Sequence, residues 1–206
     1  MALYKSELNI EAGIDEVARG CLAGPVYAAA VIWPKELDDS IDHPLLRDSK
    51  KLSKKQREEF REYIESNAID FSVAYETNDT IDSINILKAT HSAMHKAIKG
   101  LNVKPDFLLV DGNRFEPYFD EDGDVIEHEC FIKGDDKYQS ISAASILAKV
   151  YHDEYIEELV KKEPELKVYG WEKNMCYGTK THLDAIKEHG ISKYHRKTFG
   201  ICREFS

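Results

Sequence analysis

Apolar runs of strand length alternate with segments of helical periodicity along this chain, and few folds accommodate such an alternation. The runs with the length and apolar content of buried strands lie at residues 9–14, 26–33, 69–75, 106–113 and 125–132. Strands mixed with helices in this order predict an α/β fold, with a mixed β-sheet flanked by helices.

Three segments carry helix signals. Ser53 and Gln56 have the spacing of a capping box, and a charged helix is expected over residues 53–66. Apolar residues recur at helical spacing over 84–101, and again over about 140–162. The predicted sheet is therefore accompanied by three helices.

The chain is slightly longer than one typical domain. Its 206 residues contain no internal repeat and no Gly/Ser linker that would mark a boundary, so we expect a single domain over residues 1–206. From about 165 to 206 the pattern indicates a helical C-terminal extension of that domain.

The overall sequence argues against a membrane-spanning protein and against a secreted one. No stretch approaches the roughly 18 uncharged apolar residues that span a bilayer, and no uninterrupted apolar signal segment precedes the first acids. The four cysteines are scattered without a C-x-x-C pair, which favours reduced thiols over zinc binding or thiol redox chemistry. We therefore expect a cytoplasmic protein.

Carboxylates close two of the apolar runs. Asp15 and Glu16 follow the first run, and Asp111 ends the run FLLV. Adjacent side chains on a strand point to opposite faces, so Asp15 and Glu16 share a site only if the backbone bends there. Ligands of α/β sheets favour the edge where strands end, and Asp135, in the loop before the long helix, can approach the same edge. The alternative is a set of surface acids in turns.

Three or four converging carboxylates, without histidine or cysteine, favour one class of metal. Hard oxygen ligands suit Mg²⁺ or Mn²⁺ rather than Zn²⁺. Two such ions about 4 Å apart are a common device for displacement at phosphorus, one activating water and the other stabilising the leaving oxygen. Acids placed so close together need cations to neutralise them. The pattern indicates a two-metal site.

Longer stretches of the chain resemble a known family. They occur in that family's order and spacing from about Glu11 to Phe199, and they are AGIDEVARGCLAGPVYAAAVIW, RDSKKLS, IDSINILKATHSAM, FLLVDGN, IKGDDKYQSISAASILAKVYHDEY and CYGTKTHLDAIKEHGISKYHR. Together they resemble bacterial ribonuclease HII. The resemblance implies a ribonuclease H-like fold and an endonuclease that cuts RNA in RNA–DNA hybrids and at single ribonucleotides in duplex DNA. It implies cleavage 5′ of the ribonucleotide, leaving a 3′-hydroxyl and a 5′-phosphate.

The resemblance also implies metal ligands. The family's four metal-binding carboxylates fall on Asp15, Glu16, Asp111 and Asp135, with Asp153 in a structural or supporting position. The implied cofactor is Mn²⁺ or Mg²⁺, with two ions in the catalytic complex. Our hypothesis is that Asp15 and Asp111 share the metals, while Glu16 and Asp135 complete the coordination and orient the water.

The resemblance also implies substrate-binding residues, and the sequence departs from the family pattern at two positions. The loop Ala18-Arg19-Gly20 matches the family loop that meets the 2′-hydroxyl, the group that separates RNA from DNA. Ala18 stands where glycine is usual, and if its backbone needs a positive φ, the β-carbon costs on the order of 1 kcal/mol. Tyr177 matches the tyrosine that packs on the sugar, or is an ordinary half-buried tyrosine. Gln139 replaces a usual proline, which we expect to change only local stiffness.

The charge balance argues against a general nucleic-acid binder, because 38 acidic residues outnumber 28 basic ones. Phosphate contacts need only local positive charge, however. One basic cluster surrounds the start of the first helix, where Ser49 and Lys50 are the best candidates. The other lies in the C-terminal extension and comprises Lys180, His182, Lys193, His195, Arg196 and Lys197. Binding through these few contacts is expected to weaken with rising salt.

The expected partner is an RNA–DNA hybrid or a DNA duplex containing ribonucleotides, bound by a monomer without membrane contact and with help from the extension. Two alternatives remain. One is a nuclease like ribonuclease HIII, which prefers long hybrids. The other is a catalytically weak hybrid-binding protein in which Ala18 has disabled recognition. The complete set of four carboxylates argues against the latter, since a pure binder gains nothing from acids beside a phosphate backbone.

Overall fold

The computed structural model describes residues 1–7, 9–36, 46 and 52–206. Within them, a mixed sheet of six strands has the order β3-β2-β1-β4-β6-β5. The strands are β1 (Glu11–Val17), β2 (Val26–Ile32), β3 (Asp70–Glu76), β4 (Phe107–Asp111), β5 (Tyr118–Phe119) and β6 (Val125–Phe131). β4 runs parallel to both β1 and β6, whereas the other neighbouring strands are antiparallel.

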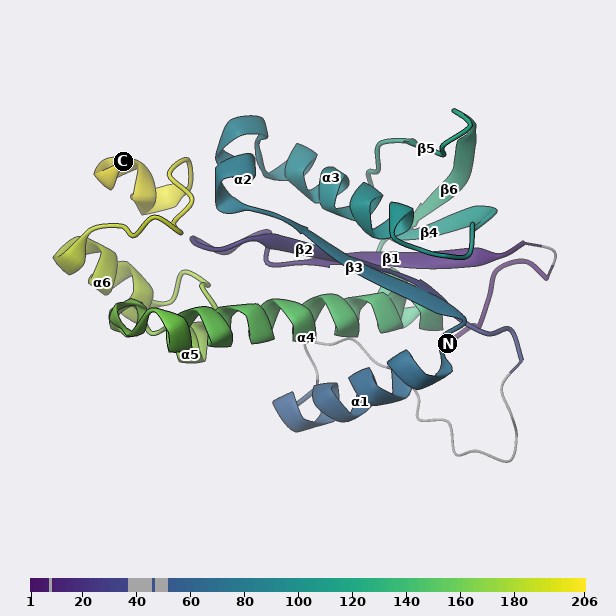
Figure 1. Ribbon diagram of the computed structural model, residues 1–206, viewed down its shortest axis with the longest axis horizontal. Coiled ribbons are helices and arrows are strands. Elements are labelled where there is room, and N and C mark those ends of the chain that lie inside the picture. Colours follow the sequence, from purple (N-terminus) through teal and green to yellow (C-terminus); the bar gives the residue numbers. More distant parts are fainter. Residues whose placement is uncertain (8, 37–45, 47–51) are drawn as a thin grey trace.

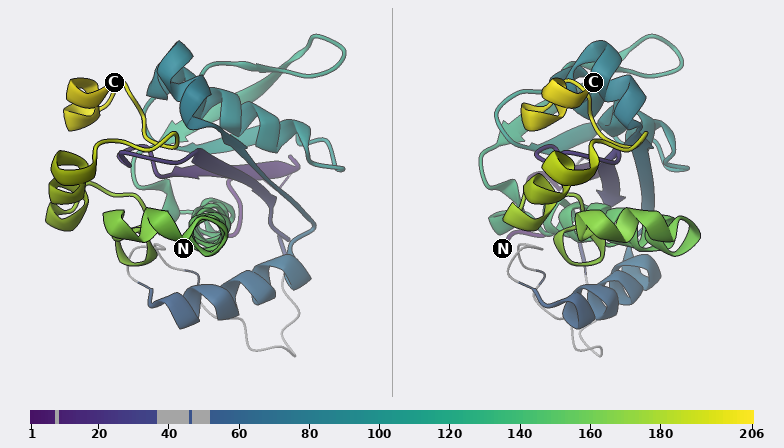
Figure 2. Two further views of the ribbon diagram at one scale, coloured as in Figure 1. Left: turned by 60° about the vertical axis from the view of Figure 1, so that its left-hand side comes forward. Right: turned by 90° about the vertical axis from the view of Figure 1, so that its left-hand side faces the viewer.

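Helices cover both faces of the sheet (Figures 1 and 2). They are α1 (Lys54–Asn67), α2 (Asn78–Ile84), α3 (Ile86–Lys99), α4 (Gln139–Lys162), α5 (Trp171–Asn174) and α6 (Lys180–His189), with short 3-10 helices at Gly134–Asp136, Pro164–Tyr169 and Gly200–Phe205. α4 lies along one face and α3 along the other, while α1 packs on the outer side of α4. The described helices all fall short of the apolar length that a membrane span requires.

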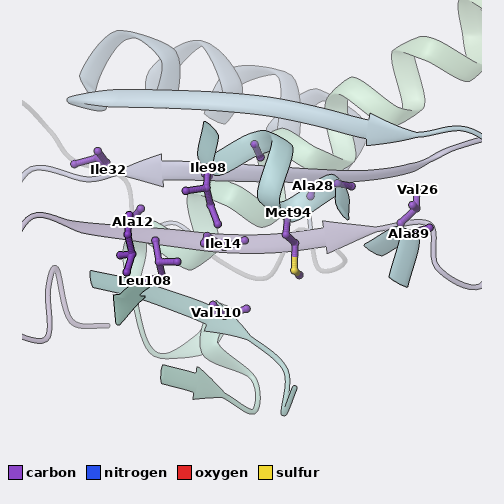
Figure 3. Packing of buried hydrophobic residues seen from close by; sticks show 14 of the residues in the cluster. Ala12, Ile14, Val26, Ala28, Ile32, Ala89, Met94, Ile98, Leu108 and Val110 are labelled. Atoms are coloured by element: carbon purple, nitrogen blue, oxygen red, sulfur yellow. The ribbon is translucent and has the colours of Figure 1, made fainter. Parts of the chain in front are cut away.

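The main core lies between α3 and the sheet. Met94 and Ile98 of α3 lie over the strand that carries Ile14, and Leu108 and Val110 of β4 extend the same cluster (Figure 3). Each of these side chains is at most 3% exposed. The predicted α/β fold with a mixed sheet is confirmed.

Several predicted boundaries differ from the structure. β1 continues to Val17, so the two adjacent acids lie within the strand rather than after it. The helix expected over 84–101 is α3, which begins at Ile86 because Asn85 has φ 69°; the separate helix α2 that precedes it was not predicted. The Asn85 side chain accepts hydrogen bonds from the amides of Leu87 and Lys88 at 3.0 and 3.1 Å, and so caps α3. The capping box at Ser53 is confirmed.

The N-terminal end of α4 packs directly on β1. A β-carbon placed on Gly13 would lie 2.2 Å from the carbonyl carbon of Ser140 and 2.4 Å from the amide nitrogen of Ile141. Just before them, Gln139 donates its amide hydrogen to the carbonyl of Ala2 at 2.9 Å, a bond that the family's usual proline could not make. Only glycine at position 13 lets the helix approach this closely.

The C-terminal extension (residues 164–206) has a small core of its own, built on the end of α4 and on the β1–β2 loop (residues 18–25). Two neutral histidines lie at its centre. Trp171 Nε1 donates to His182 Nε2 at 3.0 Å, while His182 Nδ1 lies 3.1 Å from the Tyr177 carbonyl. The Ser192 amide donates to His195 Nδ1 at 2.9 Å, and the two histidine Nε2 atoms are 3.1 Å apart. Both ring nitrogens of His182 and of His195 therefore have hydrogen-bond partners while the two imidazoles are uncharged.

We predict that Gly13→Ala lowers the free energy of unfolding by about 3 kcal/mol or more, because the β-carbon would collide with backbone atoms that cannot rotate away. The gain from replacing glycine in a strand, about 0.5–1 kcal/mol, is too small to offset this. Urea denaturation measures the difference. Gly20→Ala is the control, since nothing lies within 4 Å of its added β-carbon. Equal stability of both variants would contradict the close approach.

Stability should also fall at acidic pH through His195. Burial, followed by the neighbouring His182, lowers the pKa of His195 from 6.5 to about 4. The unfolded chain therefore takes up this proton first, so the contribution is complete above about pH 6.5 and is lost as the pH falls toward 4. The expected loss is on the order of 2–3 kcal/mol. Urea midpoints at pH 7 and pH 4.5 should differ less in His195→Gln than in the wild type; equal differences would exclude His195 as the cause.

Candidate active site

The register of two parallel strands brings two carboxylates together. The last paired residues of β1 and β4 are Ile14 and Val110, and the next residue in each strand is Asp15 and Asp111. Asp15 is 6% exposed and Asp111 is half-buried. Because parallel strands end at the same edge of a sheet, neighbouring registers place the two side chains beside each other.

The environment of Asp15 opposes its negative charge. Burial raises its pKa well above the usual range, and the nearby Glu16 and Asp111 carboxylates raise it further. Hydrogen bonds from the Ser145 side chain and from the Glu16 amide, the latter at 2.7 Å, act in the opposite direction. The buried carboxylate is thus a group that a cation would stabilise.

Glu16 lies beside the same carboxylates but carries a counter-ion. Burial raises its pKa, Asp111 adds to this, and the Arg19 guanidinium 3.1 Å from Glu16 Oε1 lowers it. Glu16, Arg19 and Asp111 line a cavity of about 360 Å³, together with His91 and Arg114. The lining of the cavity therefore combines two carboxylates with the guanidinium groups of Arg19 and Arg114.

Asp135 is held near Asp111 by its neighbour in the chain. The Gly134 amide donates to Asp111 Oδ1 at 2.7 Å. A β-carbon on Gly134 would lie 2.6 Å from Ile141 Cδ1 and 3.4 Å from that same carboxylate oxygen, so a larger residue here would displace the end of the Ile141 side chain. Asp135 follows directly and is 8% exposed, whereas Asp136 is exposed.

The donor set consists of carboxylate oxygens, which fit hard divalent cations such as Mg²⁺ and Mn²⁺. Among the residues that the structure describes, no three His, Cys, Asp or Glu side chains converge into a finished coordination cage. The expected convergence is therefore looser than a preformed site.

The β1–β2 loop begins with a strained residue. Ala18 has φ 69°, in the left-handed region that glycine normally occupies, so this position adopts that conformation despite its β-carbon. The Cys21 amide donates to the Ala18 carbonyl at 3.2 Å and closes a turn over Arg19 and Gly20. Both of these residues are exposed at the tip.

Tyr177 packs beside this loop. It pairs with Cys21 in an isolated antiparallel bridge, and its ring is crossed by the Lys149 ammonium 5.6 Å from the centroid. Burial raises the pKa of its hydroxyl, although 37% of the residue remains exposed. Tyr177 therefore offers an exposed aromatic surface next to the loop.

The basic clusters require a correction. His182, His195 and Arg196 are fully buried, so their expected role as phosphate contacts is wrong. Their donors instead bind partners inside the extension and the loop. Lys180 is exposed at the start of α6, as a phosphate contact requires. The other two candidates, Ser49 and Lys50, lie outside the described residues.

Sequence reasoning missed Lys149. Its ammonium lies 2.7 Å from Asp153 Oδ1, one turn along α4, and the i,i+4 spacing of this pair was the available signal. Burial alone would raise the pKa of Asp153, but hydrogen bonds from His152 and Lys149 hold it below its usual range. Asp153 thus holds a lysine beside Tyr177.

The chain is similar in sequence to known proteins over most of its length. The sequence model of the family Ribonuclease HII matches residues 12–202. The ribonuclease HII of Bacteroides thetaiotaomicron is 52% identical over 198 residues, covering 96% of this chain and 93% of that protein. That of Parabacteroides distasonis is 50% identical over 201 residues, covering 98% and 95%.

Solved structures share the fold. The ribonuclease H2 of Pyrococcus horikoshii superposes with a TM-score of 0.75 at 26% identity, covering 95% of this chain and 96% of that one. Bst-RNase HIII in complex with Mn²⁺ superposes with a TM-score of 0.65 at 17% identity and shares the fold, with 94% of this chain and 68% of that chain covered. With residues 12–202 matching the family model and about half of its residues identical to those of curated members, the chain belongs to the ribonuclease HII family.

Proposed function

We propose that the protein is an endoribonuclease that hydrolyses RNA in RNA–DNA hybrids and cuts 5′ of ribonucleotides embedded in duplex DNA, leaving a 3′-hydroxyl and a 5′-phosphate. The placement of Asp15 and Asp111 at the ends of adjacent parallel strands, beside Glu16, carries the proposal. Asp135 joins them through the bond from Gly134 to Asp111.

Asp15, Glu16, Asp111 and Asp135 would hold two divalent cations, Mn²⁺ or Mg²⁺. When bound, such ions lower the pKa of an attacking water and stabilise the leaving 3′-oxygen. The protein's own contribution is orientation. Ser145 and the Glu16 amide fix the Asp15 carboxylate, and the Gly134 amide fixes that of Asp111.

Substrate contacts come from the β1–β2 loop and the C-terminal extension. The exposed Gly20 backbone would meet the ribose 2′-hydroxyl, and Ala18 and Arg19 shape the same turn. Tyr177 would pack on the sugar, with Lys149 held beside it. Lys180, exposed at the start of α6, would contact a phosphate. Ser49 and Lys50 remain candidates from the sequence alone. We also propose a cytoplasmic monomer in which the extension helps to hold the duplex.

Two observations favour this function over the alternatives. Ribonuclease HIII structures match at 16–17% identity and are covered over 68–72% of their length, whereas the ribonuclease HII of Parabacteroides distasonis is 50% identical and is covered over 95%. Against a catalytically weak binder stands the left-handed backbone of Ala18, which keeps the turn that a glycine would form. Cleavage of a duplex with one embedded ribonucleotide, compared with a long hybrid, tests the assignment.

We predict that Asp15→Asn reduces kcat/KM on the single-ribonucleotide duplex at least about a hundredfold, as loss of a charged group at a reacting centre does. Its thermal stability should be unchanged or higher, because burial and two neighbouring carboxylates disfavour the charge at that position. Gel-resolved cleavage in Mn²⁺ or Mg²⁺ and thermal melts measure the two effects. Wild-type cleavage by Asp15→Asn would refute the site.

A matched pair tests the fourth carboxylate. Asp135 is buried beside the bonded Gly134, whereas the neighbouring Asp136 is exposed. Asp135→Asn should lose most of its cleavage activity, and Asp136→Asn should retain it. If both variants cleaved equally well, position 135 would have no special role in catalysis.

Ala18→Gly should change little. Relief of the left-handed strain gains about 1–2 kcal/mol. The greater freedom of the unfolded chain costs about 0.4–1 kcal/mol, and loss of a buried methyl about 0.8 kcal/mol. These effects nearly cancel, so stability should shift by less than about 1 kcal/mol, with similar cleavage rates. A strong gain of activity in the cleavage assay would instead identify the natural loop as impaired.

A further inference from the structure

A buried arginine from the C-terminal extension reaches into the β1–β2 loop. Arg196 is fully buried, and its guanidinium donates to three backbone carbonyls of that loop. Nε donates to Gly24 at 3.0 Å, Nη1 to Arg19 at 2.9 Å and Nη2 to Pro25 at 3.0 Å. The Arg196 amide also donates to the Leu22 carbonyl at 2.8 Å. One residue therefore holds both ends of the loop.

Burying the Arg196 guanidinium costs free energy, because the charged group loses its contact with water. Desolvation lowers the pKa of Arg196, but a guanidinium remains charged at neutral pH. Its charge is partly compensated by carbonyl dipoles and by the Phe199 ring, 5.1 Å from Cζ. An apolar side chain of similar volume would fill the space more cheaply. What only the planar fork provides is a fixed direction for three carbonyl groups.

One of these carbonyls determines the direction of an amide at the loop tip. The peptide bond between Arg19 and Gly20 is trans, so its C=O and N–H point in opposite directions. Because the carbonyl points inward to Arg196, the Gly20 amide points outward. Gly20 is exposed, and apart from its own atoms and its two chain neighbours no heavy atom lies within 4 Å of the position its β-carbon would take. The amide thus faces open space at the tip.

We propose that Arg196 is a positioning residue that turns the Gly20 N–H toward the ribose 2′-hydroxyl of the substrate. The inference rests on the proposed function, since only a ribonucleotide presents that hydroxyl. Arg196 contacts none of the four carboxylates through the bonds described above. It acts on the choice between ribose and deoxyribose, through the Arg19–Gly20 peptide.

The test compares two affinities in each variant. Arg196→Lys keeps the charge but cannot serve three carbonyls in a fixed fork, and Arg196→Met removes both features. Kd is measured for a duplex with one ribonucleotide and for the same duplex made only of DNA, with Asp15→Asn in every protein so that the substrate stays intact. The Kd for the all-DNA duplex divided by the Kd for the ribonucleotide duplex should fall about tenfold in Arg196→Lys, the loss expected for one hydrogen bond.

A merely structural role would not change this ratio, because misfolded protein weakens apparent binding to both duplexes alike. Arg203→Met is the matched control: Arg203 is an exposed arginine of the same extension, and it donates to the Thr198 carbonyl. Its ratio should equal that of Asp15→Asn alone.

Arg196→Lys decides the question if Arg196→Met does not fold. An unchanged ratio in Arg196→Lys overturns the inference while leaving the proposed function intact. Failure of the wild type to cleave the ribonucleotide duplex at all overturns the proposed function instead, so the two failures are distinct.

Discussion

The contact between α4 and β1 at Gly13 determines where most of the site lies. From Gly13 to Asp15 the strand advances about 6.6 Å, and five residues of a helix rise about 7.5 Å. A helix that starts against Gly13 with Ser140 therefore presents Ser145 to Asp15, where its side chain bonds the carboxylate. The same helix, continued, brings Lys149 to Tyr177. The absence of one β-carbon thus aligns a whole helix with the carboxylates.

Holding these carboxylates together works against folding. Burial and mutual repulsion raise the pKa of Asp15 and Glu16, so their charged forms are less stable here than in water. Burial of apolar side chains between α3 and the sheet, including Met94 and Ile98, stabilises the fold and offsets the free-energy cost of burying these carboxylates. In the proposed function, part of the chain's net charge of −10 belongs to the metal site, so the net charge alone does not describe the surface that would face a duplex.

Periodicity predicted the elements, because burial on one face leaves a pattern in the sequence. The capping box at Ser53 and the strand delivering Asp111 were visible in this way. The cap at Asn85 was not, since a positive-φ residue at the start of an apolar periodic segment is not distinguished by periodicity from the first turn of that helix. Arg196 also misled, because a cationic residue among polar neighbours has the pattern of a solvated surface. Its partners are backbone carbonyls, which leave no trace in side-chain composition.

Backbone strain concentrates where the loop and the extension meet. Ala18, Met175 and Cys176 all have positive φ, at 69°, 45° and 67°. The Cys176 carbonyl accepts from the Leu22 amide at 2.9 Å, so the strained segments are joined directly. Each such residue costs about 1–2 kcal/mol, and strain of this kind persists only where surrounding contacts overdetermine it. The buried guanidinium of Arg196 and the core around the neutral histidines provide those contacts. The extension is therefore required for the shape of the β1–β2 loop, and the loop cannot be understood as part of the sheet domain alone.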